Sequence, residues 1–303
     1  MTDTLVLGSR PKKARKPQAR SLPLREAIRV VAAEYDQMSV RQLFYQLVSR
    51  RAIEKTESAY KRVVDVSGQM RLDGSLDYRK ITDGHRTRRA VWSHNGVRAA
   101  LENVHDLYRR NYWLDQPWHV EVWCEKDALT GVIQPVCNRY GVTYVATRGF
   151  PSITLRYESA LEMRQIGKPT MIFYFGDHDA SGQQISDNLE AELRHHGAEV
   201  IVERMALHPV QIRQWSLPTR PGKTSDSRHA AFTARYGNAS VELDALPPNI
   251  LTGLVERAIW TVIDEEAWQR AHKVEELERE TLESLALLDL APGTTVRLHE
   301  SDR

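Results

Sequence analysis

Apolar residues recur with a helical period over the first third of the chain. In residues 40–48 they lie three and four positions apart, which places them on one face of a helix, and Ser39 before them fits a helix N-cap. A second helix is expected near residues 57–70. The stretch 71–84 then has an Asp-Gly turn signal and short β-like pieces. Helices followed by a small hairpin predict a winged helix-turn-helix, with a plain helical bundle as the alternative.

The period changes after a helical connector at residues 95–112. Short apolar runs then alternate with amphipathic segments four times, which predicts a parallel sheet with covering helices. Ser181 and Gln184 form a capping-box pattern, which predicts the start of the helix after the third strand. We therefore expect a multi-domain α/β protein. Its expected parts are a basic arm (1–20), a winged-helix-like domain with its connector (21–116), and a sheet domain with a C-terminal helical extension (117–303); the expected strands are residues 119–124, 141–147, 171–175 and 199–205.

The net charge of +2 hides a division between the two parts of this 303-residue chain. Residues 1–116 carry 23 Lys and Arg against 13 Asp and Glu, whereas residues 117–303 carry 19 against 27. A basic part joined to an acidic part suggests a nucleic-acid-binding module attached to one that holds cations, although a basic face is often only solvated. The basic positions expected to contact DNA are Arg50, Arg51, Lys61, Arg62 and Arg86.

Composition argues against several classes of protein. No apolar stretch approaches the roughly 20 residues of a membrane span, and the first residues lack a signal-peptide core with a small-residue cleavage site. The two cysteines, Cys124 and Cys137, form no CxxC pair, which argues against a disulfide framework or a zinc knuckle. We expect a cytoplasmic protein without a membrane partner, associated with the nucleoid through DNA.

Acidic residues follow two of the expected strands. Glu125 comes directly after one, and Asp177 and Asp179 lie in the sequence GDHDASG after another. Because functional groups gather at the carboxyl ends of parallel strands, these carboxylates are expected at one site. Three converging carboxylates repel one another unless a cation neutralises them, and an all-oxygen donor set favours Mg2+ or Mn2+. An ordinary surface turn is the alternative, and His178 is expected to point away.

These motifs resemble the TOPRIM fold, and most closely the family of the topoisomerase VI A subunit and its relative, the meiotic double-strand-break protein. The resemblance covers about the central third of the chain, where EKDAL (125–129), ATRGFPS (146–152) and GDHDASGQQI (176–185) follow the family's order. Ala180 stands where the family usually has a proline. This difference removes none of the expected metal ligands. The resemblance implies a TOPRIM domain preceded by a winged-helix domain, with Glu125, Asp177 and Asp179 as the metal ligands.

The same family carries a catalytic tyrosine on a winged-helix segment with the pattern Arg, a short spacer, an aromatic residue and Tyr. Arg41 to Tyr45 match that pattern. Tyr45 lies roughly 130° from the centre of the apolar stripe of its helix, so we expect it to face out of its own domain, with Arg41 one turn away. The resemblance implies a nucleophile assisted by Arg41; a DNA contact or a packed interface are the alternatives.

The resemblance implies Mg2+-dependent transesterification that leaves a tyrosyl–DNA double-strand break. It also implies a homodimer, with tyrosine and metal from different subunits, and a partner ATPase of the GHKL type. Two alternatives remain: a TOPRIM nuclease that hydrolyses DNA with activated water, and a non-catalytic DNA-binding subunit of a larger complex. Glu242 is a possible additional acid near the metal, with a solvated strand position as the favoured interpretation.

Overall fold

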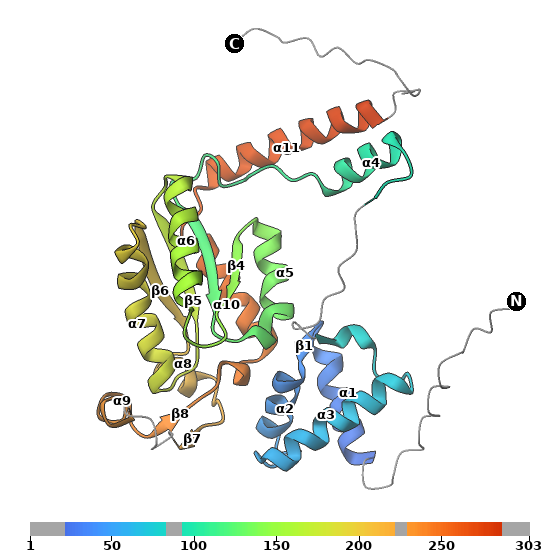
Figure 1. Ribbon diagram of the computed structural model, residues 1–303. Coiled ribbons are helices and arrows are strands. Elements are labelled where there is room, and N and C mark those ends of the chain that lie inside the picture. Colours follow the sequence, from blue (N-terminus) through green and yellow to red (C-terminus); the bar gives the residue numbers. More distant parts are fainter. Residues whose placement is uncertain (1–21, 83–92, 222–228, 287–303) are drawn as a thin grey trace, which may run out of the picture.

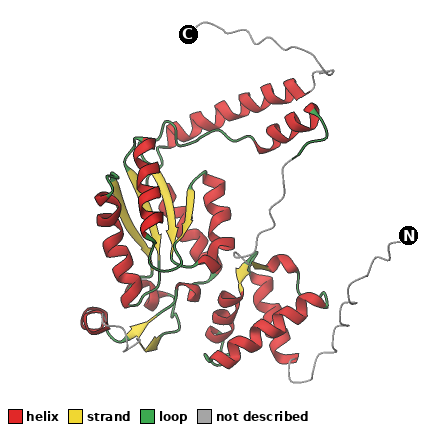
Figure 2. Cartoon of the chain, viewed as in Figure 1, coloured by secondary structure: helices red, strands yellow, loops and turns green. Residues whose placement is uncertain are grey.

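A computed structural model describes residues 22–82, 93–221 and 229–286. The protein is a mixed α/β molecule in which helices surround a parallel sheet (Figure 1), and the α/β class is confirmed. Helix is the dominant secondary structure (Figure 2). The expected basic arm (1–20) and Arg86 lie outside the described residues. Within the described part of the chain, no helix is both long enough and apolar enough to cross a membrane.

The N-terminal part consists of three packed helices, α1 (Leu22–Glu34), α2 (Val40–Ser49) and α3 (Glu57–Leu72). The expected start of α2 is confirmed, because the Ser39 hydroxyl accepts a hydrogen bond from the Gln42 N–H at 3.1 Å and the Gln42 side chain accepts one from the Ser39 N–H at 3.0 Å. This reciprocal pair satisfies two donors that a helix start otherwise leaves without partners. Helices α1 to α3 pack through the buried residues Ile28, Leu43, Leu47, Val63 and Met70.

The residues after α3 do not form a hairpin over the described stretch 71–82. The chain turns at Asp73-Gly74, as expected, and then forms a 3-10 turn, η2 (Tyr78–Lys80), whose Asp77 carboxylate accepts a hydrogen bond from the Arg79 N–H at 2.9 Å. Because that capped turn coils the chain, the strand of this stretch is short, β2 (Ile81–Thr82). It pairs in parallel with β1 (Met38–Ser39), which precedes α2 in the sequence.

A four-stranded sheet forms the centre of the molecule. Its strands are all parallel in the order β4-β3-β5-β6, which confirms the expected parallel sheet. Side chains alternate between its two faces, as the period of a strand requires. Val122, Cys124 and Phe175 join one core, and Trp123 and Tyr174 join the other. The strands are β3 (His119–Cys124), β4 (Thr143–Ala146), β5 (Thr170–Phe175) and β6 (Val200–Ala206).

Helices cover both faces of this sheet, so β5 is buried along its whole length. Helices α6 (Ile153–Ile166) and α7 (Ala180–His195) cover the face of Trp123. The other face packs against α5 (Thr130–Tyr140), the 3-10 turns η3 (Asp127–Leu129) and η4 (Leu243–Ala245), and α10 (Pro248–Trp260). The remaining short elements are α8 (Pro209–Gln214), β7 (Arg220–Pro221), α9 (His229–Tyr236) and β8 (Ala239–Ser240).

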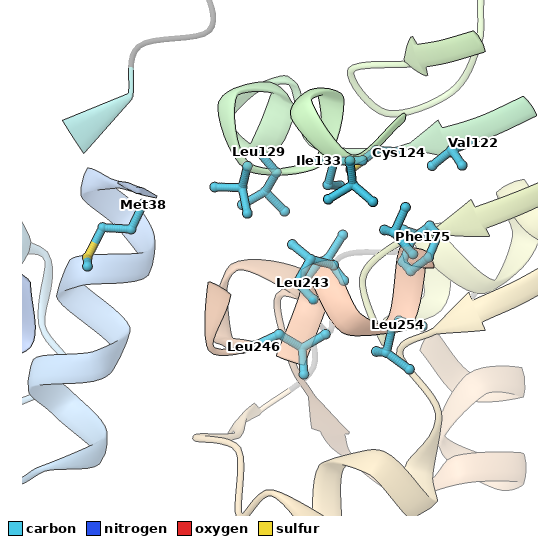
Figure 3. Packing of buried hydrophobic residues seen from close by; sticks show 14 of the residues in the cluster. Met38, Val122, Cys124, Leu129, Ile133, Phe175, Leu243, Leu246 and Leu254 are labelled. Carbon is cyan, nitrogen blue, oxygen red and sulfur yellow. The ribbon is translucent and has the colours of Figure 1, made fainter. Parts of the chain in front are cut away.

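The N-terminal helices pack onto the layer that contains α5, η3, η4 and α10. Figure 3 shows Met38 on one side and Leu129 and Leu246 on the side of the sheet domain that faces it. All three belong to one continuous apolar core. The approach is close at Gly131 in α5, where an added Cβ atom would lie 2.1 Å from the Thr82 Oγ1. A glycine is therefore needed at that position for the two parts to meet.

Helix α4 (Val97–Leu107) lies alongside α11 (Glu265–Ala286), away from the N-terminal helices (Figure 1). The two are joined just beyond the end of α4, where the Tyr108 hydroxyl donates to Glu278 at 2.6 Å and Arg110 pairs with the same carboxylate at 2.7 Å. The Arg279 guanidinium also donates to the His105 carbonyl at 3.0 Å. The connector expected at the end of the N-terminal domain thus packs against the C-terminal helix.

Candidate active site

The carboxyl ends of β3 and β5 bring two of the expected acids together. These strands are neighbours, with Cys124 opposite Phe175, so Glu125 and Asp177 leave the sheet at the same edge. The Glu125 N–H donates to the Phe175 carbonyl, and the Asp177 N–H donates to the Glu125 carboxylate, both at 2.9 Å. The Glu125 side chain therefore lies against the backbone that carries the aspartates.

Two glycines allow this approach. A Cβ atom added to Gly176 would lie 3.0 Å from the Glu125 carboxylate and 2.6 Å from the Tyr174 ring. A Cβ atom added to Gly182 would lie 2.3 Å from the Asp177 carbonyl oxygen and 3.2 Å from the Glu125 carboxylate. Both glycines are thus required by close contact rather than by a left-handed backbone conformation.

Asp179 begins the helix that follows. Its side chain accepts a hydrogen bond from the Gly182 N–H at 2.8 Å, and α7 starts at Ala180. The expected capping box at Ser181 is therefore wrong by two positions. Asp179 takes the role because it is the last residue in an extended conformation, and its charged carboxylate suits the positive end of a helix. His178, between the two aspartates, is buried against the rings of Phe232 and Tyr236.

Asp177 is the most enclosed of the three acids, with 3% of its surface exposed. Its carboxylate accepts a hydrogen bond from the Leu243 N–H at 2.9 Å and forms an ion pair with the Lys126 ammonium at 2.7 Å. Lys126 follows Glu125 directly in the sequence EKDAL. A lysine next to the first acid thus neutralises the second.

The electrostatics show that the acids act on one another. Burial raises the pKa of Glu125 to about 7, and the negative charges of Asp177 and Asp179 add to the shift. Burial likewise raises the pKa of Asp177, against the opposing charge of Lys126. Carboxylates that resist ionisation through mutual repulsion are relieved by a cation.

The donor set fits a hard divalent cation in its chemistry. Among the residues that the structure describes, no three Asp, Glu, His or Cys side chains already have the arrangement of a metal-holding group. Glu125 and Asp177 nevertheless leave the sheet at the same edge, Asp179 follows two residues later, and carboxylate oxygens are the donors that Mg2+ and Mn2+ prefer. Glu125, Asp177 and Asp179 are the side chains that would hold the ion.

Arg204 fixes the loop that carries the aspartates. From β6, its guanidinium donates to the carbonyls of Gly176 at 3.2 Å and Gly182 at 2.9 Å, and to the carbonyl of Asp177. Because these acceptors are backbone oxygens, Arg204 holds the path of the loop and leaves the carboxylates available.

Tyr45 does face out of its own helical domain, but it is not exposed. Its side chain points to Glu242, which belongs to the sheet domain, and only 3% of its surface is accessible. Burial raises the pKa of Tyr45, and the charge of Glu242 and a hydrogen bond to that carboxylate raise it further. The helical wheel predicts the direction of the side chain correctly but not the segment 242–245 that covers it.

Glu242 connects the tyrosine region to the acids. The Arg41 guanidinium donates to its carboxylate at 2.9 Å, and Arg220 pairs with it at 2.5 Å. Burial alone would raise the pKa of Glu242, but the charges of Arg220 and Arg41 outweigh it and hold the pKa below its ordinary value. The solvated position favoured from the sequence is wrong, since 5% of Glu242 is exposed.

The basic positions expected to contact DNA differ in their surroundings. Arg51, Lys61 and Arg62 are exposed on the N-terminal helices and the loop between them. Arg50 is also exposed but forms a two-pronged ion pair with Glu34, and Lys61 pairs with Glu57 at 3.0 Å. Such pairs on an exposed surface are weak and can exchange for phosphate.

Sequence reasoning missed three residues of this site: Lys126, Arg204 and Asp244. One signal was available for Asp244, because VELDAL repeats the pattern of two acids one residue apart that marks GDHDASG. The Leu243 N–H bond to Asp177 brings this second pair of acids to the first. Arg204 gave no signal, because nothing in its local sequence distinguishes it from an arginine on a solvated strand face.

No protein-family model matches the chain. No curated protein matches it significantly either.

Proposed function

We propose that this chain cleaves double-stranded DNA by Mg2+-dependent transesterification, with Tyr45 as the nucleophile, in the manner of the topoisomerase VI A subunit that it resembles. One observation carries the proposal. Glu242 contacts both Arg41 and Tyr45, and the next residue, Leu243, donates to Asp177. The segment 242–243 thus contacts the tyrosine region on one side and the strand-end acids on the other.

In this proposal the Tyr45 oxygen attacks a phosphorus atom of the DNA backbone. A tyrosyl–phosphate bond forms, one P–O bond to deoxyribose breaks, and the released deoxyribose oxygen takes up a proton. Glu242, hydrogen-bonded to the phenol and ionised, is positioned to accept the phenol proton. The Arg41 side chain, 42% exposed, keeps part of its guanidinium available to a phosphate while the rest holds Glu242.

Glu125, Asp177 and Asp179 would hold the Mg2+ ion, which when bound supplies positive charge to the transferring phosphoryl group. Lys126 and Arg204 keep these acids together and their loop in place. A winged-helix domain would grip the DNA, and a TOPRIM domain would hold the metal. The active form would be a homodimer that cuts both strands, works with an ATPase partner of the GHKL type, and acts on DNA in the cytoplasm.

One observation favours a second candidate, a nuclease that hydrolyses DNA with activated water. Tyr45 is 3% exposed, and its pKa is raised by burial, so its phenol is covered and protonated. A tyrosine in that state packs an interface between two parts of the chain. For Tyr45 to attack DNA, its phenol has to become accessible to a phosphate while it keeps its contact with Glu242.

Trapping of covalent protein–DNA complexes distinguishes the candidates. The protein is incubated with supercoiled plasmid and Mg2+, denatured with SDS, and assayed for protein attached to DNA ends. We expect attachment with the native chain, its loss in Tyr45→Phe, and its loss in Asp177→Asn. Tyr60→Phe is the matched control, because Tyr60 packs on the same Phe44 ring, 5.4 Å away, and Phe keeps the ring that contacts Arg41 while removing only the hydroxyl.

Cleavage with free ends that survives Tyr45→Phe would replace transesterification by hydrolysis. DNA binding without cleavage under any of these conditions, at a concentration that maintains dimers and with an ATPase partner supplied, would leave a non-catalytic DNA-binding subunit.

A further inference from the structure

Asp244 is a carboxylate buried in the interior of the protein. It lies in η4, none of its surface is exposed, and neither carboxylate oxygen has a hydrogen-bond partner among the residues that the structure describes. Buried carboxylates are normally paired or hydrogen-bonded, because an unpaired charge in a low-dielectric interior is costly. Burial raises the pKa of Asp244 to about 6, with the opposing charge of Lys126 as the second influence. A side chain of this kind needs an explanation.

The surroundings of Asp244 are those of the proposed metal site. The charges that act on it are those of Lys126, Asp177, Arg41 and Glu242. Its neighbour Leu243 donates its N–H to one Asp177 oxygen at 2.9 Å, and the other Asp177 oxygen pairs with Lys126 at 2.7 Å. Asp244 therefore approaches Asp177 and Lys126 from a third segment of the chain, separate from the β3 and β5 strand ends.

The Lys126 ammonium interacts electrostatically with several carboxylates. Burial alone would lower the pKa of Lys126. The negative charges of Asp177, Asp244 and Glu125 outweigh that effect and raise the pKa. Within the described part of the chain, the ion pair of Lys126 is with Asp177. Arg204, a second partly buried cation, donates to backbone carbonyls and the Ser186 hydroxyl. Glu125, Asp177 and Asp179 each accept a hydrogen bond from a backbone N–H, whereas Asp244 accepts none in the described part of the chain.

We propose that Asp244 is a further carboxylate ligand of the divalent-cation site, and that the Lys126 ammonium supplies the positive charge there until the ion binds. This inference rests on the metal site of the proposed function and extends it by one ligand and one competing cation. Glu242, two residues earlier, stays with Arg41 and Arg220. In VELDAL, Glu242 thus pairs with two arginines, whereas Asp244 would bind the metal.

Calorimetric titration with Mn2+ tests the inference on the full-length protein without DNA. We expect Asp244→Asn to weaken Mn2+ binding at least tenfold. Lys126→Met should tighten it several-fold, because the competing charge is gone. Glu121→Gln is the matched control. It also removes one charge from a buried carboxylate (3% exposed), but Glu121 is bonded to Trp123 at 2.7 Å and His119 at 3.0 Å, and its Mn2+ affinity should not change.

Thermal unfolding without metal checks that the variants fold. Asp244→Asn removes a buried charge that has no hydrogen-bond partner among the described residues, so the metal-free variant should be at least as stable as the native chain and should gain less stability from Mn2+. Equal Mn2+ affinity of Asp244→Asn and the native chain, with binding lost in Asp177→Asn, would overturn this inference and leave the metal site of the proposed function intact. A native chain that binds no Mn2+ at millimolar concentration would overturn both.

Discussion

At the scale of the residue, Glu242 combines several roles. It pairs with Arg41 and Arg220 and contacts the Tyr45 phenol, all from one buried carboxylate. These partners come from segments that are distant in the sequence. Arg41 lies 201 positions away, so the ion pair joins the N-terminal helices to the sheet domain.

Glu242→Gln tests this role. The amide keeps the shape and removes the charge, which leaves two arginines without their carboxylate. We expect a loss of about 2 kcal/mol in the free energy of unfolding, below the value for fully buried pairs because both arginines are partly exposed. Urea denaturation measures it.

Glu57→Gln is the control for that measurement. Glu57 pairs with Lys61 on the surface of α3, and both side chains are more than 70% exposed, so the change should cost at most about 0.5 kcal/mol. Equal effects of the two substitutions would mean that Glu242 holds no buried ion pair.

Residue-level prediction from the sequence succeeded where the cause is local. Ser39 caps α2 through residues three positions away, and the pattern shows it. It failed for the burial of Tyr45, for Glu242 and for Asp244, because each depends on contacts between segments far apart in the chain. A helical wheel predicts the direction of a side chain but does not show what covers it.

At the scale of the element, the loop between β5 and α7 is tightly constrained. It is held by Arg204 from one strand, by Asp179 at the start of α7, and by Glu125 from β3. Gly182, in the first turn of α7, packs against this loop, since an added Cβ atom would lie 2.3 Å from the Asp177 carbonyl oxygen.

Gly182→Ala should therefore move the loop. We expect a loss of about 2 kcal/mol in stability, typical of overpacking, together with weaker Mn2+ binding. Differential scanning calorimetry with and without Mn2+ measures both effects.

Gly68→Ala is the control for Gly182→Ala, because Gly68 also lies in a helix but has free space around it in the described part of the chain. In the described part of the chain, nothing lies within 4 Å of its added Cβ atom in α3, so the change should stabilise the protein by up to about 1 kcal/mol. A destabilisation as large as that of Gly182→Ala would show that loss of glycine itself, and not the contact with Asp177, is the cause.

The bounds of the strands were predictable from the sequence to within two residues, and so was their parallel direction, because buried runs and the turns between them are local signals; the order β4-β3-β5-β6 was not predicted. The parallel pairing of residues 81–82 with residues 38–39 was not predictable, and neither was the packing of α4 on α11. Those partners are set by packing between distant segments, which periodicity does not encode.

At the scale of the whole molecule, the division of charge has a consequence for binding. The basic part of the chain includes Arg51, Lys61 and Arg62 on the exposed surface of the N-terminal helices, and the acids of the candidate site belong to the other part. DNA bound by these cations would have an affinity that falls with salt concentration.

Salt dependence tests this arrangement. Replacing Arg51, Lys61 and Arg62 by Ala should weaken DNA binding and reduce the slope of log affinity against log salt by about 0.9 for each phosphate that is no longer neutralised. Lys273→Ala, at an exposed position on α11, should change neither quantity. Fluorescence anisotropy with a labelled duplex at several salt concentrations measures both. An unchanged slope in the triple variant would place the DNA elsewhere on the protein.

The measurement that most directly tests the central claim is the location of the covalent bond. The protein–DNA complex formed with Mg2+ is treated with nuclease and trypsin and analysed by mass spectrometry. We expect residues 42–50, the tryptic peptide that contains Tyr45, to carry the mass of a nucleotide, with fragment ions that place it on Tyr45. Cleaved DNA with no nucleotide on that peptide, or a nucleotide on another residue, would contradict the account.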